Sequence, residues 1–385
     1  MVEGGDQNAA KEPEGAASTY DAVGLAANPS GTSDADENDA LLDKLSIPRN
    51  LPSLVNIKRA LPQHVFDPHV STSMYYAFKD FVLVAATFLL AEWTWSSGLL
   101  PTSALLLLLP LYWLLQGTFF TAVFVVGHDA GHSSFSHYDW LNDVVGNVFH
   151  TFLLCPYYCW KVSHRHHHKN TGNMDKDEVY YPIRKRDDSG IITIPGFGLG
   201  MGWFAYLMVG YGPRPVNHFN PMHPMLKRHA VACILSLALV AAWAAVLWQY
   251  ALTYGFLKLF VHFIAPDLVF ASYMVIITFL HHTEEEIPWY DDSLWNYVRG
   301  QLSSVDRNYG WCHGIIHNIG THQIHHLFSK VPHYHLEEAT AVFRNKFPLL
   351  VQTRGDRILP AFCRMFSKYA SQKVIDDSTK VHLYK

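Results

Sequence analysis

The chain has 385 residues and a formal net charge of −4, so neither a basic surface for nucleic acid nor a strongly acidic composition dominates it. Charged residues make up only 16% of the chain, against about 25% in ordinary soluble domains, while aromatic residues reach 14%. This balance argues against a nucleic-acid-binding protein and predicts an integral membrane protein.

Residues 1–48 are rich in Gly, Ala, Ser, Asn, Asp and Glu and show no apolar periodicity, which predicts a disordered acidic N-terminal tail. The segment lacks the basic start and apolar stretch of a signal peptide. We therefore expect the chain to enter the endoplasmic reticulum membrane through internal spans.

Two stretches without any Asp, Glu, Lys or Arg, residues 103–126 and 230–257, are long enough to cross a hydrocarbon layer of about 30 Å. Each has a weaker partner, residues 74–91 and 268–280, which needs tilt or snorkelling side chains at its ends. The sequence thus predicts about four transmembrane helices in two hairpins, with six spans as the alternative.

The two hairpin turns are expected near residues 95–101 and 254–266, which hold almost no Lys or Arg. The basic residues gather before the first span, after the second and after the fourth, so both termini are expected in the cytosol. Residues 140–160 are amphipathic and aromatic, and we expect them to lie along the membrane surface.

The predicted fold class is an all-α integral membrane protein with a cytosolic helical cap beyond the spans. We assign residues 49–350 to this membrane domain and residues 351–385 to a cytosolic C-terminal tail.

Histidine is unusually frequent, with 24 copies, and most of them follow the predicted spans. Three short motifs, HDAGH, HRHHH and HQIHH, place rings at helical spacings of three and four residues, which puts them on one helix face. The rings concerned are His128 and His132, then His164, His167 and His168, and then His322, His325 and His326. His281 and His282 stand at the end of the fourth span, so both hairpins bring imidazoles to the same membrane face.

Imidazole binds iron, copper, nickel and zinc, so the ligand type alone does not identify the metal. Eight such histidines, plus one from the pair at the fourth span, exceed the needs of one tetrahedral zinc and indicate two metals. The Glu-x-x-His pairs of soluble di-iron bundles are absent from these motifs, so a nitrogen-rich site for two irons is expected. A His-rich metal transporter is disfavoured, because its ligands would lie near mid-membrane.

The segments HDAGHSSFS, HRHHHKNTGNMDKDEVYYP and HNIGTHQIHHLFSKVPHYHLEEAT resemble the three histidine boxes of membrane fatty-acid desaturases. The resemblance is to the methyl-end group, which includes delta-12 and omega-3 desaturases. It runs from about residue 54 to about residue 348 and also includes SLVNIKRALPQHVF, FLHHTEEEIPWY and VRGQLSSVDRNYG.

The resemblance implies a di-iron enzyme that uses O2 and two electrons to leave a cis double bond in an acyl chain. The eight box histidines are implied as iron ligands. The family's further ligand is assigned to His282, with His281 and His317 as rivals or as hydrogen-bonding neighbours. Four carboxylates are candidates for holding the ligand rings: Asp129, Asp175, Asp177 and Glu178. An apolar tunnel lined by the spans is expected to set the position of the double bond.

Within the group, Asp129 in HDAGH, Gly320-Thr321 and the IPWY segment at residues 287–290 resemble omega-3 enzymes, which favours omega-3 desaturation of omega-6 C18/C20 chains. HRHHHKNTG and PYYCWKVSHR resemble delta-12 enzymes, and Ala130 departs from the commonest omega-3 pattern, so delta-12 (oleate) desaturation is the alternative. A hydroxylase, acetylenase or conjugase on the same scaffold stays open, and a sterol or alkane hydroxylase is less favoured.

The chain lacks the HPGG-type segment of a fused haem domain, so the resemblance implies electrons from a separate cytochrome b5 and its reductase. A basic rim for that acidic partner has five candidates: Arg165, Lys169, Arg184, Lys185 and Arg186. The acyl chain is expected to be carried by a lipid or by coenzyme A, and no nucleic acid is expected.

Overall fold

The computed structural model describes residues 34–385, and the chain divides into two units, residues 1–50 and residues 51–385. In the first unit the described residues form helix α1 (Asp34–Lys44), whose Asp39 and Asp43 bind Arg49. This helix lies inside the segment for which the sequence predicts a disordered tail. The remainder of that predicted tail, residues 1–33, lies outside the described residues.

The second unit is mostly helical, as predicted, and in the described residues its strands are only two residues long. Its longer helices are α2 (Leu54–Ala60), α3 (Val70–Ser96), α4 (Thr102–His132), α5 (Asp139–Phe152), α6 (Tyr157–Asn170), α7 (Gly200–Met208), α8 (Ala230–Tyr254), α9 (Phe256–Leu259), α10 (Ala265–His282), α11 (Tyr297–Gln301), α12 (His322–Leu327), α13 (His333–Lys346) and α14 (Ile358–Gln372). Short turns of helix are η1 (Gln63–Phe66), η2 (Lys185–Asp187), η3 (Pro195–Gly198), η4 (Lys227–His229), η5 (Phe260–Ile264), η6 (Gly310–Cys312) and η7 (Pro348–Leu350). The strands are β1 (Ile183–Arg184), β2 (Trp289–Tyr290), β3 (Asp306–Arg307), β4 (Thr353–Arg354), β5 (Val374–Ile375) and β6 (Val381–His382).

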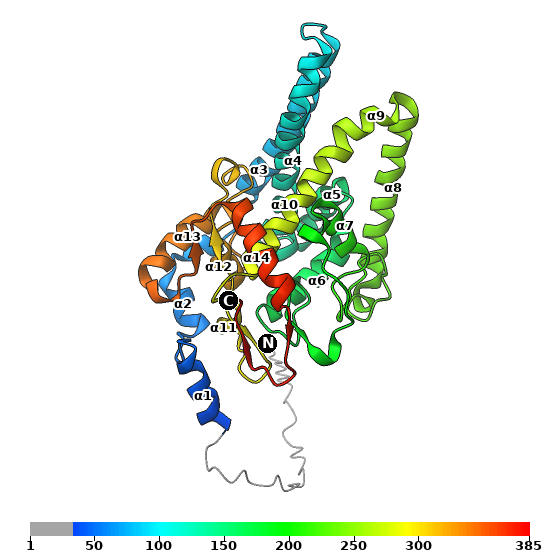
Figure 1. The fold of residues 1–385 in the computed structure, drawn as a ribbon. Helices are drawn as coiled ribbons and strands as arrows, with labels where there is room; N and C mark the ends of the chain where they lie inside the picture. Colours follow the sequence, from blue (N-terminus) through cyan, green and yellow to red (C-terminus); the bar gives the residue numbers. More distant parts are fainter. Residues whose placement is uncertain (1–33) are drawn as a thin grey trace, which may run out of the picture. The chain divides into compact units, whose positions relative to one another are not determined.

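Four helical stretches among residues 34–385 are long and apolar enough to cross a membrane: Val70–Ser96, Thr102–His132, Lys227–Tyr254 and Phe256–His282. The predicted number of four is thus confirmed by length and composition. Three predicted spans each fall within one of these helices, and the span predicted at residues 230–257 runs three residues past the end of the third. Figure 1 shows the two pairs, α3 with α4 and α8 with α9 and α10, projecting from the same side of a cap formed by α11, α12 and α13.

The fourth span is longer than the sequence predicts. The expected turn near residues 254–266 is confined to Gly255, whose φ of 91° is a conformation that glycine adopts without a steric cost. From there α9, the π-helical turn η5 and α10 continue as one helix of 27 residues. The π turn shifts the backbone pairing just before Pro266, which has no N–H to donate, so proline does not end the helix.

Two glycines allow close packing against α10. A Cβ on Gly117 of α4 would lie 2.6 Å from the Val269 Cβ, and a Cβ on Gly200 of α7 would lie 2.4 Å from the Leu268 carbonyl oxygen. Small residues at such crossings let two helix backbones approach closely within a membrane. The two contacts place α4 and α7 on α10, where they form walls of the site described below.

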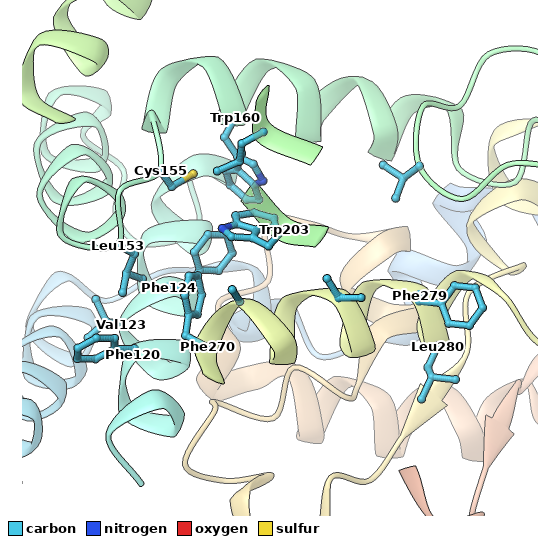
Figure 2. Packing of buried hydrophobic residues seen from close by; sticks show 14 of the residues in the cluster. Phe120, Val123, Phe124, Leu153, Cys155, Trp160, Trp203, Phe270, Phe279 and Leu280 are labelled. Carbon is cyan, nitrogen blue, oxygen red and sulfur yellow. The ribbon is translucent and has the colours of Figure 1, made fainter. Parts of the chain in front are cut away.

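An aromatic cluster fills the space between four of these helices. Phe124 of α4 lies at its centre, with ring centroids 5.1 Å from Trp160 of α6, 5.5 Å from Trp203 of α7 and 5.4 Å from Phe270 of α10 (Figure 2). Such edge and tilted ring contacts each add about 0.5–1.5 kcal/mol beyond the area that they bury. The cluster fixes α6 and α7 against the end of the first hairpin.

Helix α5 covers most of the region that the sequence predicts to lie along the membrane surface. Its exposed face carries an apolar stripe of Trp140, Val144 and Val148 at four-residue intervals, while Val145 and Phe149 are buried against the rest of the unit. An exposed apolar stripe on a short helix beside the spans supports the prediction of an interfacial helix.

The segment predicted as a C-terminal tail is instead folded into the second unit. β5 pairs with β1 in parallel, β6 pairs with β2 antiparallel, and β4 pairs with β3 in parallel. Met365 of α14 and Tyr384 are fully buried in the main apolar cluster. Sequence periodicity did not indicate this, because two-residue strands and one amphipathic helix do not reveal which distant segments they contact.

Candidate metal centre

The first helical hairpin delivers two rings at the end of α4. His128 and His132 are one helix turn apart, so their rings lie on the same face, with centroids 4.6 Å apart. Both are buried. The helix ends directly afterwards at Ser133, whose left-handed φ of 58° directs the chain away from the site.

Helix α6 places His164, His167 and His168 on its inner face. The Arg165 side chain points elsewhere and donates to the Gly131 carbonyl at 3.0 Å. The His166 side chain is 37% exposed. The structure therefore brings in the three rings that the i, i+3, i+4 spacing selects and leaves out the two intervening residues.

The second hairpin ends at His282, and the short helix α12 adds His322, His325 and His326. All four rings are buried. All nine histidines predicted as ligands therefore meet at one place, at the ends of α4 and α10 and on α6 and α12.

The nine rings form two groups. In the five-ring group, one nitrogen from each ring lies within 4.8 Å of those of the others, and its members are His128, His132, His164, His168 and His325. The second set of mutually close nitrogens comes from His167, His282 and His326, and His322 adjoins it through His282 and His326; these four are called the four-ring group. Its Nε2 atoms are separated by 3.2 Å between His167 and His282, by 3.1 Å between His282 and His322, and by 2.9 Å between His322 and His326.

Hydrogen bonds to the outer nitrogens determine which atoms carry protons. His167 Nδ1 lies 2.8 Å from Asp177 Oδ1 and must donate to it, which leaves a lone pair on its Nε2. His326 Nδ1 lies 3.1 Å from Gln301 Oε1, and Gln301 is oriented because its amide nitrogen donates to the His168 carbonyl. The Nε2 of His326 therefore also carries a lone pair that points into the four-ring group.

Burial, followed by the neighbouring imidazoles, holds the pKa of each of these rings well below its usual range, so the rings are neutral: His164, His168, His322, His325 and His326. Neutral nitrogens facing one another at about 3 Å repel unless a cation lies between them. Two nitrogens about 2.1 Å from a shared metal lie about 3.0 Å apart when the angle between them is 90°. The donor set therefore fits a metal in each group.

The two rivals for the ninth position are engaged elsewhere. His281 lies 2.5 Å through Nδ1 from the Val305 carbonyl and 3.0 Å through Nε2 from the Tyr309 hydroxyl, so both of its nitrogens are occupied. Its ring stacks on His322 at 4.1 Å. His317 Nε2 lies 2.6 Å from Asp80 Oδ2. Of the three candidates, His282 is the one whose nitrogen faces the other rings.

The four candidate carboxylates take different roles. Asp177 contacts His167 as expected, and Asp129 Oδ1 lies 3.6 Å from His128 Nδ1 while its other oxygen accepts from His333. Asp175 does not contact a ligand ring but binds the Arg184 guanidinium. Glu178 Oε1 lies 2.6 Å from the Ser163 hydroxyl, and Glu178 Oε2 lies 3.6 Å from Nδ1 of His166, whose ring is outside the two groups.

Sequence reasoning missed Gln301, Thr171 and His333. The first two meet His326 Nδ1, and His333 holds Asp129 through its backbone N–H and its Nδ1, both at 2.9 Å. None of them stands at a helical spacing from a ring that it supports. Of the three, His333 could have been suspected from the sequence, because it lies in the segment PHYHLEE, which follows the third motif and contains two histidines.

A small cavity adjoins both groups. Its walls are mostly apolar and come from α4, α6, α7 and α10, with Phe124, Val125, Trp203, Met274 and Ile277 among them. Rings of both groups, including His128 and His282, line the same cavity. A mostly apolar lining with a few polar groups suits an apolar ligand.

The proposed basic rim is only partly available. Arg184 is buried in its ion pair with Asp175, and Lys185 lies 2.5 Å from Asp376. Arg186 and Lys169 remain exposed. Arg184 therefore stabilises the loop after α6 and is removed from the candidates for a docking surface.

Comparisons with known proteins identify similar chains. The family model described as fatty acid desaturase matches residues 103–356. An "sn-1 acyl-lipid omega-3 desaturase (ferredoxin)" of Nostoc sp. (strain 36) is 37% identical over 299 residues, which cover 76% of this chain and 80% of that protein. A "Delta(12)-fatty-acid desaturase" of Arabidopsis thaliana is 37% identical, covering 76% and 80%. An "Omega-3 fatty acid desaturase, endoplasmic reticulum" of Nicotiana tabacum is 38% identical, covering 74% and 76%.

Proposed function

Since the chain belongs to the fatty acid desaturase family, we propose that it is an oxygen-dependent omega-3 desaturase acting near the methyl end of omega-6 C18/C20 acyl chains. Membership makes it an oxidoreductase of acyl lipids, and transport of metal is thereby excluded as its main activity. The observation that carries the proposal is the pair of buried imidazole groups beside a mostly apolar cavity.

We assign the metals to two irons, one in each group, held by the nine rings. Nine imidazole donors exceed the four ligands that a single tetrahedral zinc would take, and iron is among the metals that imidazole suits. Bound irons would supply the oxidising power that removes hydrogen from an unactivated carbon chain with O2.

The residues of the protein position the acyl chain and keep water away from it. The walls from α4, α7 and α10 hold the acyl chain next to both groups and exclude water from it. Asp177 and Gln301 fix the proton of their ring on Nδ1, so that Nε2 faces inward in the correct tautomer.

The omega-3 position is supported by Asp129, by Gly320-Thr321 and by the IPWY segment at residues 287–290. The delta-12 position is the second candidate, favoured by HRHHHKNTG and by the equal similarity to the Arabidopsis relative. The two activities differ in which carbons of the bound acyl chain lie next to the histidine rings.

Expression in a host that supplies cytochrome b5, with linoleate, arachidonate and oleate fed separately, tests this choice. Mass spectrometry that locates the new double bond is the measurement. New omega-3 products from linoleate or arachidonate support the proposal. Conversion of oleate alone shows a delta-12 enzyme, and a hydroxylated, acetylenic or conjugated product shows a variant reaction on the same scaffold.

We further propose that electrons come from a separate cytochrome b5, although the Nostoc relative's name includes ferredoxin. The exposed Arg186 and Lys169 are the basic residues that support this proposal. Reduction by either carrier, measured side by side with the purified protein, distinguishes them. A rate with cytochrome b5 that falls with added salt is expected.

The proposed location is the endoplasmic reticulum membrane with both termini in the cytosol. Cys363 on α14 is the exposed cysteine among the described residues, whereas the other four are buried. A membrane-impermeant maleimide added to sealed microsomes should therefore label the chain at this residue. A cysteine introduced at Ser97, in the first hairpin turn, should react only after the vesicles are opened.

A further inference from the structure

Glu178 is a buried carboxyl group that the metal centre does not use. It lies in the loop after α6, it is 3% exposed, and its Oε1 lies 2.6 Å from the Ser163 hydroxyl. Its Oε2 is buried without a hydrogen-bond partner among the described residues. An ionised carboxylate in such a place would be costly, because no Lys or Arg among the described residues forms an ion pair with it and His166 lies 3.6 Å away.

The surrounding hydrogen bonds favour a protonated Glu178. His218 Nδ1 lies 3.1 Å from the Leu207 carbonyl and must donate to it. Burial lowers the pKa of His218 to about 4, so the ring is neutral and its Nε2 is an acceptor. Ser163, 2.9 Å from that Nε2, therefore donates its hydroxyl proton to His218. The hydrogen bond between Ser163 and Glu178 then needs the proton of the Glu178 carboxylic acid.

The same hydroxyl connects Glu178 to the cavity. Tyr206 of α7 lines the cavity beside the imidazole groups, and its hydroxyl lies 3.3 Å from Ser163 Oγ. On the other side, Glu178 Oε2 lies 3.6 Å from His166, whose side chain is 37% exposed. Carboxylic acid and two hydroxyls thus form a continuous row from near the surface to the cavity wall.

Desaturation requires protons as well as electrons. A –CH2–CH2– unit, O2, two electrons and two protons give –CH=CH– and two waters. The electrons come from a one-electron carrier protein, and the protons come from solvent. Because the imidazole groups and the cavity are shielded from bulk water, those protons need a route through protein groups.

We propose that Glu178 is the proton donor for this reaction and that it acts through Ser163 and Tyr206. Tyr206 gives its hydroxyl proton to reduced oxygen in the cavity and regains one from Ser163. Ser163 regains its proton from Glu178, and the carboxylate left behind is reprotonated from solvent. The proposal rests on the desaturase function proposed above.

The charged and titratable neighbours agree with an acid that works at neutral pH. Burial, with the adjacent Asp177, raises the pKa of Glu178 to about 8, against the opposing effect of Arg214. His166 on α6, the neutral His218 and Tyr206 on α7 complete its surroundings. A donor is active while protonated, so this step is expected to be lost as the pH rises through about 8.

The first test uses the metal-free protein and infrared spectroscopy. The wild type is expected to show a carboxylic acid C=O band that disappears with a midpoint near pH 8. The band should be absent from Glu178→Gln and retained in Glu337→Gln, which alters a carboxylate that is 61% exposed. An ionised Glu178 at pH 7 overturns the proposal.

The second test uses the loaded enzyme. Glu178→Gln keeps an N–H to donate to Ser163 but has no proton to transfer, so kcat should fall on the order of 100-fold with KM unchanged. Its rate should also lose the decline above pH 8, whereas Glu178→Asp should recover part of kcat. Tyr206→Phe should resemble Glu178→Gln, and Glu337→Gln should match the wild type. A wild-type kcat and pH profile in Glu178→Gln overturns the proposal.

Product analysis separates this proposal from the omega-3 assignment. A delta-12 product would refute the omega-3 position and leave the comparison of Glu178 variants valid, because either position needs the same two protons. If the wild-type protein has no desaturase activity, both the proposed function and the proposed role of Glu178 as proton donor are overturned.

Discussion

At the residue scale, the site depends on which nitrogen of each ring is free. Asp177 and Gln301 hold protons on the outer nitrogens of two rings, and burial keeps His164, His168 and the three rings of α12 neutral. Neutral rings leave their inner lone pairs available to a cation and do not compensate its charge. Each ring and each supporting acceptor therefore has a separate, measurable effect on metal binding.

Replacing a ring of the four-ring group should remove one metal. For His167→Ala we expect iron to fall from about two to about one per chain and desaturation to be abolished, because catalytic metals need their full ligand set. Iron analysis of the purified protein, together with product analysis, measures both. The matched control is His166→Ala, which removes the neighbouring, half-exposed ring. Equal iron content in the two variants would contradict the ligand assignment of this helix face.

Removing the acceptor behind His167 should weaken the site without removing a ligand. Asp177→Asn no longer fixes the proton on Nδ1, so we expect metal affinity to fall about 10–100-fold, as is typical for such supporting groups. Competition with a chelator measures the affinity. Asp292→Asn is the control, since Asp292 is 55% exposed and binds Lys176 at the surface. An unchanged affinity in Asp177→Asn would show that packing alone orients the ring.

At the scale of secondary-structure elements, the metal centre depends on how closely two helices approach. α4 and α10 carry His128, His132 and His282 at their ends, so their separation determines the distance between rings of the two hairpins. Gly117 is the point of closest contact. A Cβ there would meet the Val269 side chain and the Pro266 carbonyl oxygen at 2.6 and 2.7 Å.

Gly117→Ala should therefore separate the hairpins. Overpacking of a tight contact costs about 1–3 kcal/mol, and a backbone carbonyl cannot rotate away as a side chain can. We expect a lower thermal unfolding midpoint in detergent and a lower iron content. Gly355→Ala is the control, because a Cβ at that glycine meets no atom within 4 Å. Identical midpoints for the two variants would refute the argument.

At the scale of the whole molecule, the C-terminal segment closes the cap around the site. Arg364 on α14 contacts Glu284, which is two residues after His282 and also bonds to the buried Arg307. β5 and β6 add pairing to segments on either side of the fourth span. The C-terminal segment thus supports the end of α10, where the four-ring group begins.

Deletion of residues 358–385 should expose this apolar contact area and remove Arg364 from Glu284 and Asp356. We expect poor yield of folded protein and loss of iron from the remainder, because a truncated buried ion network leaves uncompensated charge. Size-exclusion chromatography and iron analysis measure the two effects. Leu359→Ala, at a side chain that is 65% exposed, is the control. A truncated chain that stays monodisperse and loaded would show that the segment is dispensable.

The sequence by itself determined the local features of this protein. Apolar length predicts four spans, and spacings of three and four residues select the box histidines while leaving out Arg165 and His166, because a helix has a fixed repeat. Those same motifs carry the family resemblance that the comparisons confirm.

Tertiary structure alone decided how the rings are shared between the two groups and which nitrogen faces inward. His325 joins the rings of α4 while His326 joins His282, although the two are adjacent on α12. It also turned His282 rather than His281 toward the other rings and paired Asp175 with the buried Arg184. It placed Gln301 beside His326. These outcomes depend on the packing of helices distant in sequence, and the periodicity of one helix contains no information about the position of its neighbours.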